Sequence, residues 1–83
     1  MNSRDIVLNI AVNMGWIGRF AQEGQLSRVK QFLTESREYL SQLPLHLRNP
    51  KFEIWLKLAG ENVDPEEAYT WSNILTHQAK LIS

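Results

Sequence analysis

The sequence contains no cysteine among its 83 residues, and nine lysines and arginines balance nine aspartates and glutamates. The lack of cysteine excludes disulfides, thiolate nucleophiles and cysteine-ligated zinc or iron–sulfur sites. Small secreted domains usually depend on disulfides, so the same lack favours a cytoplasmic protein. The zero net charge provides no long-range field that would draw the chain to nucleic acid or to an anionic membrane surface.

Long apolar runs are lacking as well. Asn9 and Asn13 interrupt the most apolar stretch, residues 5–21, which is also shorter than the roughly 20 residues that cross a bilayer. The stretch lacks the unbroken apolar centre of a secretory signal. A hydrophobic content of 43% and a charged content of 22% are ordinary for a globular domain. We therefore expect one soluble domain, residues 1–83, that does not enter a membrane.

Residues that could carry catalysis or bind a metal are few and scattered. Neither His46 nor His77 has a histidine or a carboxylate three or four residues further on, which a helical metal site requires. Glu66 and Glu67 are explained by their position at a predicted helix start. The two glycines of residues 15–18 fall inside a predicted helix, not after a strand as a phosphate-binding loop would. We expect no enzyme activity, no metal and no cofactor.

Apolar residues recur at spacings of three and four along most of the chain, which predicts helices and leaves no alternating strand pattern. Pro44 should close the second helix, and Gly60 should stop the third. Pro50 and Pro65 suit the first position of the third and fourth helices. Short connections favour antiparallel neighbours, so the expected fold is all-α, a small four-helix bundle made of two helical hairpins. The predicted helices cover about residues 4–22, 26–43, 50–59 and 65 to the C-terminus.

Two kinds of local signal support these helix boundaries. Gly24 is placed to supply the left-handed residue that follows the first helix. Asp64 is the predicted N-cap of the fourth helix, with Glu67 at the position that completes a capping box. Within the third helix, Glu53 and Lys57 have the spacing of an i,i+4 ion pair.

The first helix carries glycines in its interior, where each costs about 1 kcal/mol relative to alanine. At about 100° per residue, Ala11, Gly15 and Gly18 form a narrow strip of small residues beside the predicted core. This strip permits close approach of another helix or a ring, and the third or fourth helix is the expected neighbour. The core sector itself consists of Ile6, Val7, Ile10, Met14, Ile17 and Ala21.

A third sector of the same helix is also apolar, because Leu8, Val12, Trp16 and Phe20 follow one another at intervals of four. Two interpretations remain: the row packs inside the bundle, or it docks a partner, identical or different. Tryptophan and phenylalanine are common in interface hot spots. The third helix is apolar around more than half its circumference, so Trp55 is a candidate neighbour. We expect a small non-enzymatic protein–protein interaction module (an adaptor, regulator or assembly subunit), with a homodimer among its candidate assemblies.

The alternative is a weak nucleic-acid or anion-binding protein that uses the basic middle of the chain. Glu35 and Glu38 are interspersed there, no aromatic residue accompanies the cations on that face, and the overall basic excess of DNA-binding domains is lacking. Nucleic acid is therefore the less favoured partner. The basic residues concerned are Arg28, Lys30, Arg37, Arg48 and Lys51.

Residues 16–36, WIGRFAQEGQLSRVKQFLTES, resemble one hairpin of a tetratricopeptide repeat. The resemblance covers about a quarter of the chain and implies a helical hairpin with a peptide- or protein-binding role. Val29 stands where the family prefers alanine, and the turn at Gly60 does not repeat the pattern, so no repeat array is expected. The matching positions are Phe20, Gly24, Leu26, Val29, Leu33 and Ser36.

Overall fold

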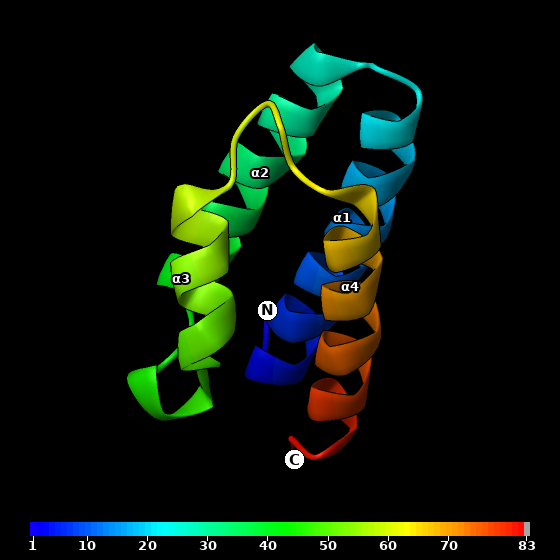
Figure 1. Ribbon diagram of the computed structural model, residues 1–83. Helices are drawn as coiled ribbons and strands as arrows, with labels where there is room; N and C mark the ends of the chain where they lie inside the picture. Colours follow the sequence, from blue (N-terminus) through cyan, green and yellow to red (C-terminus); the bar gives the residue numbers. More distant parts are fainter. Residues whose placement is uncertain (83) are drawn as a thin grey trace.

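The computed structural model describes residues 1–82, which form four α-helices and one short 3-10 turn and contain no strand (Figure 1). This confirms the all-α fold of four helices. None of these helices is long and apolar enough to cross a membrane. The elements are α1 (Ser3–Gln22), α2 (Leu26–Ser41), η1 (Leu45–Leu47), α3 (Pro50–Leu58) and α4 (Pro65–Lys80).

Three helices begin with a side-chain cap, and the cap at Asp64 is the one predicted above. Asn2, Asn49 and Asp64 accept hydrogen bonds from backbone N–H groups two or three residues further on, at 2.8, 3.1 and 2.9 Å respectively. Each bond satisfies one of the donors that a helix start leaves without a partner in the helix. Gly24 has a φ of 72° and turns the chain from α1 into α2, as predicted.

Three helix ends differ from the prediction. α4 ends at Lys80, whereas it was predicted to continue to the C-terminus. α2 ends at Ser41, and the expected irregular connection contains the 3-10 turn η1. α3 ends because Ala59 adopts an extended conformation with a ψ of 138°. Gly60 does not take the left-handed conformation, since Gly24 alone does so among residues 1–82. The third helix is therefore stopped one residue earlier than predicted, and not by a glycine turn.

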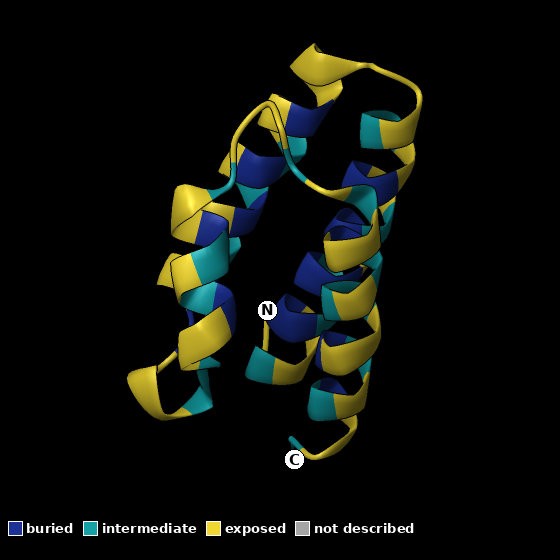
Figure 2. Ribbon diagram, in the orientation of Figure 1, coloured by how far each residue is buried: buried dark blue, intermediate teal, exposed yellow. Residues whose placement is uncertain are grey.

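α1 is the central helix of the fold and packs against both α4 and α2, whereas α3 packs lightly on α2. Figure 2 shows the buried residues on the sides of the helices that face one another. The buried apolar core draws on all four helices, which is why one chain of this size forms one unit. Its members include Ile10, Met14 and Ile17 of α1, Val29 and Leu33 of α2, Phe52 and Leu56 of α3, and Ala68, Leu75 and Ala79 of α4.

A buried polar pair lies between α1 and α2. The side-chain amide of Asn13, 7% exposed, donates to the hydroxyl of Ser36, 0% exposed, at 3.3 Å. A buried polar group needs its partner opposite it, so the pair favours one alignment of the two helices. In the sequence Asn13 interrupts the apolar stretch of the first helix, and in the structure its side chain faces α2.

Candidate functional site

The strip of small residues on α1 is covered by α4. The Ser72 hydroxyl donates to the backbone carbonyl of Ala11 at 2.7 Å. A Cβ on Gly18 would lie 2.6 Å from the ring of Tyr69, and one on Gly15 would lie 3.7 Å from the Ser72 hydroxyl. The glycines thus permit a close contact within the chain, and the helix that makes it is the fourth.

The apolar row Leu8, Val12, Trp16 and Phe20, here called the outer row, crosses the solvent-facing side of α1. Val12 is 57% exposed and Trp16 is 41% exposed, whereas Leu8 and Phe20 are half-buried against the core. Each step of four residues turns the row by about 40° around the helix. The row therefore begins beside the strip that α4 covers, crosses the open face at its two middle members and ends beside α2.

Stacked rings extend the outer row onto α2. The rings of Trp16 and Phe20 have centroids 5.6 Å apart, and those of Phe20 and Phe32 are 5.7 Å apart, with interplanar angles of 18° and 17°. The guanidinium of Arg19 lies 5.8 Å from the Trp16 ring, and that of Arg28 lies 5.4 Å from the Phe20 ring. Stacking and cation–π contacts both restrain these side chains. The result is a preordered aromatic surface with positive charge at its edge.

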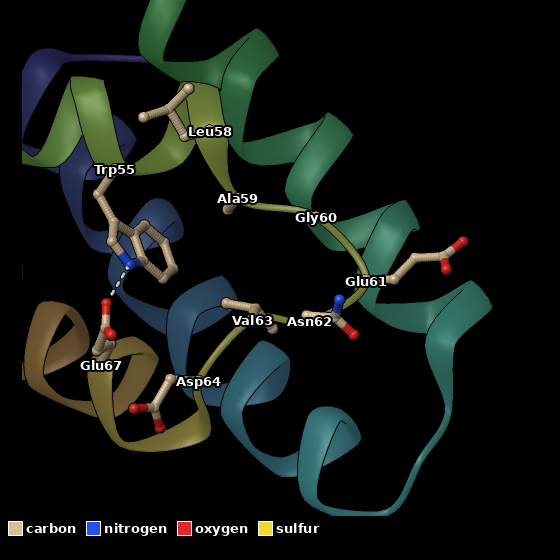
Figure 3. A pocket seen from close by; sticks show the side chains of 9 residues that line it. All are labelled: Trp55, Leu58, Ala59, Gly60, Glu61, Asn62, Val63, Asp64 and Glu67. Carbon is tan, nitrogen blue, oxygen red and sulfur yellow. Dashed lines mark hydrogen bonds between the residues drawn. The ribbon is translucent and has the colours of Figure 1, made fainter.

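Trp55 belongs to a different aromatic cluster. Its ring lies 6.1 Å from that of Phe52 and 6.5 Å from that of Trp71. Its indole N–H donates to Glu67 at 2.8 Å across a shallow groove of about 400 Å³ (Figure 3). Trp55 is therefore placed between α3 and α4, and none of the ring contacts in residues 1–82 joins its cluster to Trp16. The capping box predicted for Glu67 is wrong, because its carboxylate turns to this indole.

The groove beside Trp55 has an acidic lining whose carboxylates are engaged within the chain. Asp64 caps α4, and Glu67 accepts from Trp55. Glu61 pairs with Lys30 of α2, whose hydrogen bond and positive charge lower the pKa of the Glu61 carboxyl. In the described part of the chain, no group of three or more histidine, aspartate or glutamate side chains is arranged to hold a metal ion.

The basic residues of the alternative prediction do not form one free cationic face. Arg37 donates to backbone carbonyls at the end of α3, and Arg48 donates to carbonyls around the end of α2. Lys30 pairs with a carboxylate of the α3–α4 loop, and Arg28 lies over an aromatic ring. Four of the five are exposed, and the fourth of these, Lys51, lies at the start of α3. This arrangement uses most of the charge in intramolecular contacts.

Glu53 also takes a partner other than the predicted one. Its carboxylate accepts a hydrogen bond from Arg48 at 3.0 Å, and this pair replaces the expected pair with Lys57. The turn η1 brings Arg48 to the side of α3 while its guanidinium also bonds to the carbonyl of Leu43 at 2.9 Å. A pair that ties two elements together is therefore favoured over one along a single helix.

No protein-family model, curated protein or solved structure matches this chain. The tetratricopeptide resemblance of residues 16–36 is thus not accompanied by a family match. The fold and the site define the chain as a small all-α protein with a preordered aromatic surface on its central helix. Sequence reasoning missed Phe32 and Arg28 as members of that surface. Phe32 follows Val29 by three residues in the apolar stripe of α2, and this spacing does not distinguish a core residue from one at the edge of the surface.

Proposed function

We propose that this chain is a small, non-enzymatic protein–protein interaction module that docks a partner on the outer row. The observation that carries the proposal is the exposure of Val12 and Trp16, 57% and 41%, on the helix at the centre of the fold. Large apolar side chains that gather on a surface mark interaction sites far more often than isolated ones do. An adaptor, a regulator and an assembly subunit all use such a surface.

The composition and order of the surface support this function. Aromatic and arginine side chains are the residue types that dominate interface hot spots, and here Trp16, Phe20 and Phe32 stack while Arg19 and Arg28 lie over their faces. Rings that are already restrained lose little freedom on binding. The lack of cysteine favours the cytoplasm as the compartment of this interaction.

A photo-crosslinking amino acid at Val12 tests the proposal in cells that produce the protein. We expect covalent adducts from Val12 that disappear when Trp16→Ala is introduced into the same chain. Lys51 is the matched control, because it is exposed at the start of α3 and outside the outer row. No adduct from Val12, or equal adducts from Val12 and Lys51, would contradict the proposal.

The salt dependence of binding separates this function from the nucleic-acid alternative. The affinity of apolar docking changes little with salt. The affinity for phosphates falls steeply as the salt concentration rises, because binding releases counterions from the nucleic acid. We expect the yield of Val12 adducts to stay nearly constant as salt is raised. A steep fall, together with nuclease sensitivity, would favour the basic residues as the binding surface.

A further inference from the structure

We infer that the partner docked on the outer row is a second copy of this chain, with the two α1 helices antiparallel and crossing at Val12. This inference rests on the proposed function, because it names the occupant of the same surface. It comes from the order of charged and apolar residues along the exposed face of α1. Apolar residues and opposite charges lie at equal distances on either side of Val12, so a two-fold axis at Val12 would bring each residue beside its counterpart in the other copy.

The apolar part of the symmetry consists of Leu8 and Trp16, which lie four residues before and four residues after Val12. An antiparallel copy related by a two-fold axis at Val12 brings Leu8 of each chain to the level of Trp16 of the other. The three residues form one i,i+4 ridge, and such ridges pack into the grooves of a facing helix. The smaller Leu8 side chain of one copy thereby lies opposite the larger Trp16 side chain of the other, and this contact occurs twice in the same interface.

The charged part of the symmetry consists of Asp5 and Arg19, seven residues on either side of Val12. Seven residues are nearly two turns, so both lie within about 20° of the direction of Val12 and about 10 Å from it along the axis. Both are exposed. In the antiparallel pair, Asp5 of each copy lies at the level of Arg19 of the other, so opposite charges flank the apolar centre at both ends.

Glu23 is the group that competes for Arg19 within one chain. Its carboxylate lies 3.2 Å from the Arg19 guanidinium, and both side chains are largely exposed, at 41% and 62%. An exposed i,i+4 pair is weak and screened by salt, so Arg19 can be shared with Asp5 of the copy. If the partner were an unrelated protein, nothing would require Asp5 and Arg19 to lie at equal distances from Val12.

Light scattering coupled to size-exclusion chromatography of the purified full chain gives the first test. We expect a mass near 9.7 kDa at low concentration and twice that mass at high concentration. Trp16→Ala should weaken dimerisation by about tenfold or more, as for a central aromatic contact. A monomer at all concentrations would overturn the inference.

Charge reversal tests the antiparallel geometry itself. Asp5→Arg places two like charges opposite each other at both ends of the interface, and so does Arg19→Asp. Each variant alone should dimerise at least about tenfold more weakly. An equimolar mixture of the two variants restores opposite charges at both ends, so native mass spectrometry should show the mixed dimer. This rescue also demonstrates that both variants are folded.

The outcomes separate this inference from the proposed function. A wild-type dimer that ignores both charge reversals, or a mixture that forms no mixed dimer, overturns the second-copy geometry. A purified monomer whose Val12 crosslinks in cells to a different protein also overturns it, while the docking function of the outer row stands. Absence of both dimer and crosslinks overturns both proposals.

Discussion

The two apolar faces of α1 differ in how they are packed: α4 covers one closely, and the other is partly exposed. On one face, Gly15 and Gly18 let α4 approach so closely that the Tyr69 ring occupies the space a Cβ on Gly18 would need. On the other face, Val12 and Trp16 remain 57% and 41% exposed. A chain of this length has too few helices to cover every side of its central one. The small residues mark the contact made within the chain, and the large residues mark the surface that we propose a partner covers.

The largest expected effect comes from closing the space at Gly18. In Gly18→Ala the new methyl group would meet a rigid ring whose hydroxyl is held at 2.9 Å by Gln22. Overpacking of this kind typically costs about 1–3 kcal/mol, and the gain in helix propensity offsets about 1 kcal/mol. We expect a net loss of up to about 2 kcal/mol in the free energy of unfolding, measured by urea denaturation.

Two further variants show whether the close contact with Tyr69 is the cause. Gly15→Ala adds the same methyl group one turn away, where it would lie at an ordinary 3.7 Å from the Ser72 hydroxyl, so it should stabilise the fold by about 0.5–1 kcal/mol. In a Tyr69→Ala background, Gly18→Ala should also become stabilising. If Gly18→Ala still lowered the free energy of unfolding in the Tyr69→Ala background, the close contact with Tyr69 would not be the cause of the loss.

The second prediction concerns α3, which packs far more lightly than α4. Arg37 of α2 donates to the carbonyl of Leu56 at 2.9 and 3.2 Å and to that of Ala59 at 2.7 Å. These bonds satisfy carbonyls that the end of α3 leaves free. Arg37→Met keeps the apolar stem and removes the donors, so the fold should lose about 1 kcal/mol. Amide hydrogen exchange should increase in α3 before it increases in α1.

Arg28→Met is the matched control for Arg37→Met. Arg28 lies on the same helix, but its guanidinium lies over the Phe20 ring, and an exposed contact of this kind contributes about 0.5–1 kcal/mol at most. The control should leave hydrogen exchange in α3 unchanged. Equal exchange in the two variants would mean that Arg37 does not hold α3.

The backbone of this fold was largely predictable because its signals are local. The N-caps Asn49 and Asp64 stand directly before prolines, and Gly24 has the φ of 72° that its position required. The apolar sectors of α1 followed from the same periodicity, since spacing alone separates the sectors of a helix, but the sequence left open whether the outer row is exposed. The periodicity did not reveal whether the third or the fourth helix would cover the strip of small residues, because that depends on the order in which helices pack.

Side-chain partners were less predictable because they depend on tertiary distances. Glu53 and Glu67 were assigned to partners close in sequence, and each instead bonds to a residue from another element, Arg48 and Trp55. Asn13 was noted only as an interruption of the apolar stretch, and its burial against Ser36 was not predicted. The partners of Asn13 and Glu67 lie 23 and 12 residues away, and Arg48, five residues from Glu53, reaches it only through the turn η1. Helical spacing along the chain carries no signal for such contacts.

The smallest predicted effect concerns the ion pair that ties the α3–α4 loop to α2. The hydrogen bond and charge of Lys30 lower the pKa of Glu61, so the pair stabilises the fold above the usual carboxyl pKa of about 4.3. This contribution is lost as the pH falls through the lowered pKa. Lys30→Gln should raise the pKa of Glu61 towards its usual value, as measured by carboxyl NMR titration, while Lys51→Gln should leave it unchanged. Because the pair is exposed, the stability of the α1–α4 contact should hardly change in Lys30→Gln. An equal loss of stability throughout the fold would contradict the difference between the closely packed α1 and α4 and the lightly packed α3.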